Sequence, residues 1–414
     1  MKKLYSIIFI FFAFVVSAQY NNDFLFYSLN KRSINLNTEY EINSNAISNA
    51  FINKFYTGGY INTKMKDDVN KKLHLYNRVG GYLNYNMVGF FGKEASRYRF
   101  AVGVKQQQLF NSGFSRDFFK LGFFGNKIYQ GGTANLSNSS INLYSFQEFK
   151  FGLILTEVDT NHASMGISIS YLKGQNLLQL NTNTTSVYTA GDASQISLST
   201  NATLAMSDTS KTGLSAVNGN GASAEFFAET PYRSKLGKSK FFLCVNNLGF
   251  IRWNKNSLNY TADSTFNYSG IKVNNLFELK DSTIQAIKAD SIFNNSTEFS
   301  RHYVSTNLPT SFFITHKIEF TPWFAFTNGF RHVFNANYKP YIFIENEFRF
   351  NSKVLLSLHV GYGGYGKLNA GIYGIFKIAD KMQLRLGSNS IQGFISPKNT
   401  LGQGAYFSLS YKID

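Results

Sequence analysis

The chain has 414 residues and a formal net charge of +17, and 17% of its residues are aromatic whereas only five are prolines. Its single cysteine, Cys244, excludes an intrachain disulfide, so packing and backbone hydrogen bonds must hold the fold. The positive charge forms no Lys/Arg run interleaved with aromatic residues, which argues against nucleic acid as a partner.

The N-terminal segment has the parts of a secretory signal peptide. Lys2 and Lys3 precede an apolar stretch over 4–16, and Val16–Ala18 supplies the small residues of a cleavage site. The stretch is shorter than the roughly 20 residues of a spanning helix, and no later segment is long enough to be one. We therefore predict a signal peptide over 1–18 and an exported chain over 19–414. The exported chain is either a soluble secreted protein or a closed β-barrel.

Nine predicted strands lie between residues 34 and 334, and two polar inserts separate some of them. The strands are expected over 34–43, 80–90, 97–108, 142–156, 162–175, 221–230, 238–247, 311–319 and 322–334. The inserts are 176–220, rich in Asn, Thr, Ser and Gly, and 248–310. A short helix is predicted over 281–292, where Ile284 and Ile287 share a helical face after the caps Asp281 and Ser282.

The C-terminal third alternates regularly between apolar and polar residues. Runs over 341–350, 354–362, 368–378 and 382–386 have one apolar and one polar face, as strands with a period of two residues do. Connections of a few residues join them, which indicates hairpins and an antiparallel meander. A soluble sandwich would alternate as well, so this pattern alone does not identify a membrane protein.

The last strand, 404–413, favours the membrane alternative. Gly404, Phe407, Leu409 and Tyr411 match the outer-membrane assembly signal, Gly-x-x-aromatic-x-hydrophobic, although Ile413 and Asp414 follow the last aromatic residue. We predict an all-β transmembrane antiparallel barrel of about 14 strands (12–16) in the bacterial outer membrane. Its expected partners are outer-membrane lipids, including lipopolysaccharide, and the barrel-assembly machinery. If the last strand runs towards the periplasm, strand parity places both inserts outside the cell as long loops.

Several charged residues are predicted to line the lumen because they lie on the polar faces of the C-terminal strands. They are Glu345, Glu347, Arg349, His359, Lys377 and Arg385. Two interpretations stay open. The carboxylates either form a structural ion network, with Lys377 and Arg385 as partners, or they contact a solute in the pore.

The sequence predicts no catalytic, cofactor-binding or metal-binding residue, and hence no enzyme. Residues 361–366 read G-x-G-x-x-G, but a strand rather than a helix follows, so the glycines belong to a hairpin turn. None of the six histidines is paired at helical zinc-site spacing. His359 lies near Ser357 but has no identified orienting partner for hydrolysis.

The segment Leu248–Trp253 combines an apolar cluster with Arg252 and Trp253 at a strand end. Phe250, Arg252 and Trp253 together suit an anchor at the membrane interface. The alternative is that the segment folds inwards as a contact of a plug.

Several stretches resemble an uncharacterised family of Bacteroidota outer-membrane barrels, defined as a domain of unknown function. They are Phe118–Leu121, Gly125–Lys127, Gly132–Leu136, Leu248–Trp253, Phe266–Ile271 and Leu308–Thr310. This resemblance implies an outer-membrane barrel and supplies no activity or catalytic residue. A looser similarity to fatty-acid-transporter-type barrels is an analogy of fold only.

Barrel size gives the functional expectation. Eight strands nearly fill a barrel with their own side chains, whereas fourteen enclose more space. We therefore expect a passive channel or transporter for small or hydrophobic solutes. The alternative is a surface or assembly component, associated with secretion or motility, that binds partners through its long loops.

Overall fold

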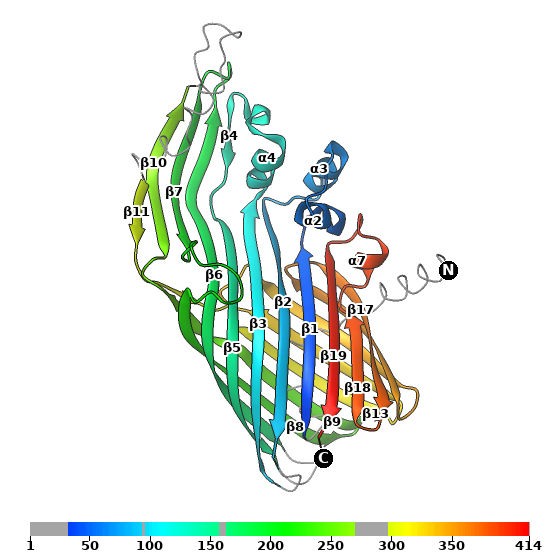
Figure 1. Cartoon of the computed structure of the whole chain (residues 1–414). Coiled ribbons are helices and arrows are strands. Elements are labelled where there is room, and N and C mark those ends of the chain that lie inside the picture. Colours follow the sequence, from blue (N-terminus) through cyan, green and yellow to red (C-terminus); the bar gives the residue numbers. More distant parts are fainter. Residues whose placement is uncertain (1–31, 93–95, 157–162, 270–296, 414) are drawn as a thin grey trace, which may run out of the picture.

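The computed structural model describes residues 32–92, 96–156, 163–269 and 297–413, and these form a closed antiparallel barrel of fourteen strands (Figure 1). The predicted signal peptide, 1–18, and the predicted helix, 281–292, lie outside the described residues. In order around the wall the strands are β1 Ser33–Ser44, β2 Tyr76–Phe91, β3 Tyr98–Ser115, β5 Ser139–Thr156, β6 Ser164–Thr189, β8 Gly219–Ser234, β9 Gly237–Trp253, β13 Ser311–Thr321, β14 Phe324–Val333, β15 Lys339–Arg349, β16 Val354–Gly364, β17 Leu368–Ala379, β18 Met382–Ser388 and β19 Gly402–Lys412.

Strand β1 closes the ring because it pairs with β2 on one side and with β19 on the other. The fold class is therefore confirmed, and each of the fourteen predicted runs coincides with one strand of the wall. Several strands are longer than predicted, above all β6, which continues from the predicted end at 175 to Thr189.

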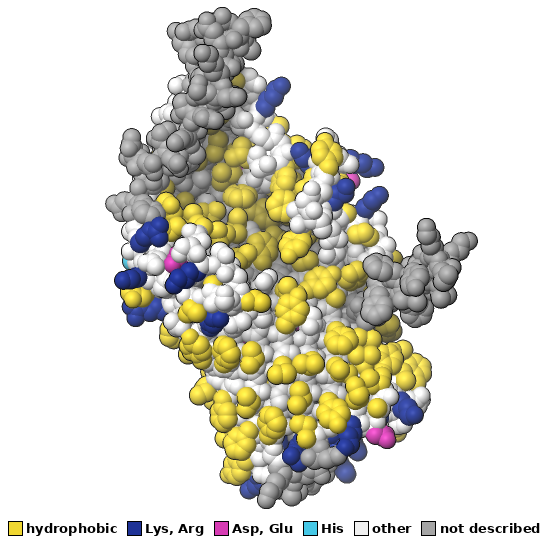
Figure 2. Space-filling view, viewed as in Figure 1, with side chains coloured by type: hydrophobic (Ala, Val, Ile, Leu, Met, Phe, Trp, Pro, Cys, Tyr) yellow, Lys and Arg dark blue, Asp and Glu magenta, His cyan; other side chains and the backbone are white. Residues whose placement is uncertain are grey.

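The two faces of the wall differ in polarity. Outward side chains in the lower part of the barrel are mostly apolar, as Figure 2 shows, and include Phe100, Val102, Phe151, Ile167, Ile169, Ile344 and Val360. Inward side chains include many buried polar groups, among them Glu39, Lys105, Gln107 and Glu148. An apolar exterior around a polar interior is the arrangement that a membrane-spanning barrel needs.

The two ends of the barrel also differ. Short connections join β13 to β14, β15 to β16 and β17 to β18 at one end, which we call the turn end. The opposite end, the loop end, carries the helices α2 Asn49–Tyr56, α3 Thr63–Asn70, α4 Arg116–Phe124, η2 Asn126–Tyr129 and α7 Gln392–Ile395. Phe51, Val69 and Phe119 of the first three pack against Val79 of β2 and Phe114 of β3, so these helices are docked against the wall.

The described parts of both predicted inserts are largely strands rather than loops. Beyond the rim of the barrel, residues 176–189 of β6 pair with β4 Gly132–Asn135 and β7 Ile196–Met206. Strand β7 pairs in turn with β10 Leu258–Tyr268, which pairs with β11 Thr297–Arg301. These strands form an extension, here called the wing, that rises from one side of the loop end (Figure 1). A further strand, β12 Val304–Asn307, returns the chain along β9.

In the described ranges, no helix is long and apolar enough to cross a membrane. The same ranges contain no group of three or more His, Cys, Asp or Glu side chains placed to hold a metal ion.

Candidate functional site: the lumen

Aromatic side chains line part of the lumen as a continuous belt. Phe227, Phe242, Phe313 and Phe343 follow one another across β8, β9, β13 and β15, with ring centroids about 6 Å apart (6.1, 6.2 and 5.9 Å in sequence), and Tyr341 continues the belt 5.9 Å from Phe343. All five rings are buried, so side chains rather than open solvent surround them. The belt thus contributes an apolar core inside the barrel.

Glycines on neighbouring strands make room for these rings. A Cβ atom on Gly166 of β6 would lie 2.2 Å from Phe227, and one on Gly329 of β14 would lie 2.2 Å from Phe343. Tyr341 uses Gly361 of β16 in the same way, since a Cβ there would lie 2.0 Å from the phenol oxygen. The rings therefore rest on the backbone of the wall, where any larger residue would displace them.

On the side of the long strands, the lumen holds a buried ion cluster. Lys150 of β5 lies 2.5 Å from a carboxylate oxygen of Glu225 on β8 and 3.6 Å from one of Glu148. Ser170 donates a hydrogen bond of 2.6 Å to Glu148. All three charged side chains are at most 2% exposed, so each charge depends on its partners for stabilisation.

On the side of the short strands, a second ion cluster includes two of the predicted lumen-lining residues, Glu347 and Arg349. Lys317 of β13 lies 2.8 Å from Glu347, and Arg349 bridges Glu347 and Glu319, each at 3.0 Å. Glu345, on the same strand, is buried. Because Arg349 is 39% exposed and Glu319 35% exposed, this cluster is open to solvent at the turn end.

The two predicted partners of these carboxylates differ in their outcome. Lys377 forms its ion pair with Asp380 in the following turn, at 3.0 Å, so the expectation that it pairs with Glu345 or Glu347 is wrong. Arg385, the other predicted partner, hydrogen-bonds Tyr406 on β19 and also interacts electrostatically with Glu347. His359 is buried, and its Nε2 lies 2.7 Å from the hydroxyl of Tyr341, with its ring against Phe343. His359 thus belongs to the aromatic belt.

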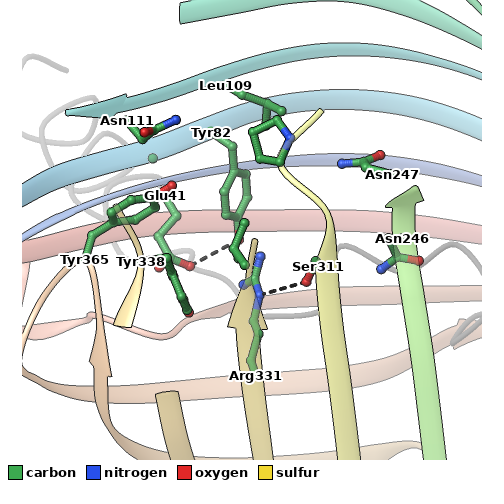
Figure 3. A pocket seen from close by; sticks show the side chains of 13 residues that line it. Glu41, Tyr82, Leu109, Asn111, Asn246, Asn247, Ser311, Arg331, Tyr338 and Tyr365 are labelled. Atoms are coloured by element: carbon green, nitrogen blue, oxygen red, sulfur yellow. Dashed lines mark hydrogen bonds between the residues drawn. The ribbon is translucent and has the colours of Figure 1, made fainter. Parts of the chain in front are cut away.

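A contact between opposite walls crosses the lumen near the loop end. Strands β2 and β14 are seven positions apart in the ring of fourteen, yet the guanidinium of Arg331 lies 5.8 Å from the ring centre of Tyr82 (Figure 3). The same guanidinium lies 5.7 Å from the ring of Tyr338, so two tyrosines flank it. Ser311 accepts a hydrogen bond from Arg331 Nε at 3.3 Å. We call Tyr82, Arg331 and Tyr338 the cross-lumen cluster.

Acidic and loop residues hold the cluster in place. Tyr82 donates a hydrogen bond of 3.1 Å to Glu41 on β1, and Asn389 donates another to the same carboxylate oxygen. Tyr338 lies between β14 and β15, and burial raises the pKa of its phenol well above the ordinary value, so the phenol stays neutral. Tyr365, in the turn between β16 and β17, packs edge-on against Tyr338 at 5.0 Å.

A cavity of about 40 Å³ lies beside the cross-lumen cluster. Its lining combines the cluster with Glu41, Tyr365 and three asparagines, Asn111, Asn246 and Asn247 (Figure 3). Asn247 has a φ of +56°, in the left-handed region that asparagine tolerates, and it lies at a bulge where the β8–β9 register shifts. The bulge brings two successive asparagines to the cavity, although a regular strand would turn one of them away.

The segment after β12 closes one side of this cavity. Trp253 is fully buried and donates a hydrogen bond of 2.9 Å to Thr306, while Leu308 packs with Trp253 and Ile251. Pro309 then lines the cavity. Of the predicted anchor residues, only Trp253 is buried. Phe250 is exposed, and Arg252 stacks on Tyr303 at 4.3 Å.

Sequence reasoning missed the residues that cross the lumen. Tyr82, Arg331 and Glu41 lie on predicted strands, and Arg331 lies on the polar face of its run. Their contact was not predicted, because pairing across the barrel depends on ring closure and not on the local pattern of any one strand. The predicted terminal residues lie in β19, where Phe407 and Tyr411 face outwards and Gly404 is buried.

Comparison with known proteins places the chain in a family. A family of unknown function, DUF5723, matches residues 28–389. The chain belongs to DUF5723. No curated protein matches the sequence significantly.

Solved outer-membrane barrels resemble this DUF5723 member weakly. The toluene transporter TodX of Pseudomonas putida shares 8% identity at a TM-score of 0.42, over 92% of this chain and 89% of TodX. A FadL homologue of Pseudomonas aeruginosa shares 9% at a TM-score of 0.39, over 92% and 90% of the two chains. The translocator domain of the Neisseria meningitidis autotransporter NalP shares 6% at 0.34, over 92% and 88%. At these values the likenesses assign no solute.

Proposed function

We propose that this protein is a passive channel or transporter of the bacterial outer membrane for small or hydrophobic solutes. The proposal includes a lumen closed by side chains of the wall itself, where Arg331 meets Tyr82. The observation that carries the proposal is the contact between Arg331 and Tyr82 across the lumen, beside a cavity lined by aromatic rings and amides. Such a closure consists of side chains and of the connections β14–β15 and β16–β17, which carry Tyr338 and Tyr365. It can open by rotamer changes and loop movement, without unfolding of the wall.

Conductance of the refolded chain in planar lipid bilayers tests this function. We expect low conductance for the wild type and a several-fold larger conductance for the Tyr82→Ala, Arg331→Ala double variant, because both halves of the bridge are then removed. Tyr85→Ala is the matched control, since Tyr85 lies on the same strand but is 49% exposed on the outer face. If the double variant folds and stays as impermeable as the control, the channel proposal fails.

The proposed orientation places the turn end in the periplasm and the loop end outside the cell, as in other barrels with short periplasmic turns. The apolar outer face would then contact outer-membrane lipids, including lipopolysaccharide at the loop end. We further propose that the barrel-assembly machinery recognises β19 through Gly404, Phe407, Leu409 and Tyr411.

The wing favours a second function, as a surface or assembly component that binds partners. Its strands extend beyond the barrel rather than lie across the lumen (Figure 1). One face of the sheet packs against α4 and η2 through Val187 and Leu198, which leaves the opposite face available outside the membrane. A solute-impermeable barrel in which the double variant above also fails to conduct would favour this function.

A further inference from the structure

One face of the wing is covered with hydroxyl and amide side chains in a regular array. Cross-strand pairing of β6, β7 and β10 aligns them in rows, of which two are Tyr188–Ser197–Asn267 and Ser186–Ser199–Thr265. Rows of this kind repeat about every 7 Å along a strand, with groups about 4.8 Å apart across strands. The described part of this face on the three strands carries one charged side chain, Asp263.

Hydrogen bonds between these side chains fix their orientation. Ser197 donates to Asn267 Oδ1 at 2.6 Å, and Gln195 donates to the same oxygen at 3.0 Å. Thr265 donates to Ser199 at 3.3 Å. Asn267 and Thr265 nevertheless stay exposed, so their remaining donors and acceptors face solvent. The array is therefore ordered before any ligand arrives, which lowers the entropic cost of binding.

The chemistry of this face selects one class of ligand. Because its described part on β6, β7 and β10 carries no Lys or Arg, this face offers no site for phosphate, sulfate or nucleic acid. It has few of the apolar anchors that dominate protein interfaces. Hydroxyls and amides both donate and accept hydrogen bonds, as sugar hydroxyls do. Tyr188 adds a ring that is 42% exposed, on which the apolar face of a sugar can stack.

We propose that this face of the wing binds a neutral carbohydrate. It is the face that continues the lumenal side of β6, because Leu177 and Ala205, at the base of the wing, pack in one cluster with Trp253 and Tyr144. A bound glycan would therefore lie above the loop-end mouth of the barrel. The proposal does not depend on whether the barrel conducts solutes.

Binding to the refolded full-length chain tests this proposal. Titration calorimetry in a sugar-free detergent would use maltohexaose, cellohexaose, laminarihexaose and mannohexaose as neutral probes and hexagalacturonate as the anionic one. We expect at least one neutral hexasaccharide to bind and the anionic one to bind at least tenfold more weakly. Tyr188→Ala and Asn267→Ala should each weaken binding of that neutral probe tenfold or more.

Tyr268→Ala is the matched control. Tyr268 is 39% exposed and pairs with Ile196, which places it on the opposite face of the same sheet. Its removal should leave the affinity within twofold of the wild type. Loss of binding in the control to the same extent as in Tyr188→Ala would overturn the placement on this face. Absence of binding by all four neutral probes, or stronger binding of hexagalacturonate, would overturn the proposal itself.

Discussion

The two sides of the barrel differ in the length of their strands and in the burial of the charged side chains that point into the lumen. From β2 to β9 the wall strands have 16 to 26 residues, and β6 continues beyond the rim, whereas from β13 to β19 they have 7 to 12 residues. Both sides point charges into the lumen. On the long side Lys150 and Glu225 are each 2% exposed, while on the short side Lys317 and Glu347 are 18% and 11% exposed.

Because of this difference in burial, breaking an inward ion pair should change the stability of the barrel by different amounts on the two sides. A fully buried ion pair adds little net stability, but removing one partner leaves an uncompensated charge in a medium of low polarity. A pair open to solvent loses little when broken, because water and salt replace the partner. The following substitutions test whether the two sides differ in this way.

The largest effect is expected for Lys150→Met on the long side. It leaves Glu148 and Glu225 buried beside each other, which should lower the free energy of unfolding by about 3–5 kcal/mol. Urea unfolding of protein refolded into lipid vesicles measures this loss. Adding Glu148→Gln and Glu225→Gln to the same chain should recover much of it, because none of the three charges of this cluster then remains. If the Lys150→Met variant is as stable as the wild type, the proposed role of the cluster is contradicted.

A smaller effect, equal on both sides, is expected where rings rest on glycines. Gly166→Ala on the long side and Gly361→Ala on the short side should each cost about 1–3 kcal/mol, since a methyl group would overlap Phe227 or Tyr341. Gly122→Ala in α4 is the control, because, apart from its chain neighbours and the backbone of its own helix, no atom lies within 4 Å of the position that its methyl group would take. Phe227→Leu should partly rescue Gly166→Ala. If the two stability losses differ greatly, the backbone or the ring on one side must shift to accommodate the added methyl group.

The smallest effect is expected for Arg349→Met on the short side. Arg349 and Glu319 are each more than a third exposed, so the loss should be below about 1 kcal/mol. Added salt should remove most of this difference, because screening weakens the exposed pair in the wild type. The effect of Lys150→Met should change little with salt. If both losses respond equally to salt, the contrast between the two sides is not one of burial.

Much of the wall could be predicted because its signal is local. Alternation in runs such as 354–362 and 368–378 assigns each side chain to a face, and short turns fix the order of neighbours. The wing was missed because residues 196–206 are rich in Ser, Thr and Asn, a composition that also describes loops. Its strands form because β6 continues past the rim and offers a template edge.

The sequence by itself therefore determined the fold class, the fourteen wall strands and the inward direction of residues such as Glu347 and His359. Only the closed ring decided which inward groups meet. Arg331, for example, reaches Tyr82 from the opposite wall. The physical reason is that alternation depends on neighbouring residues, whereas contacts through the lumen depend on strand number, register and tilt together.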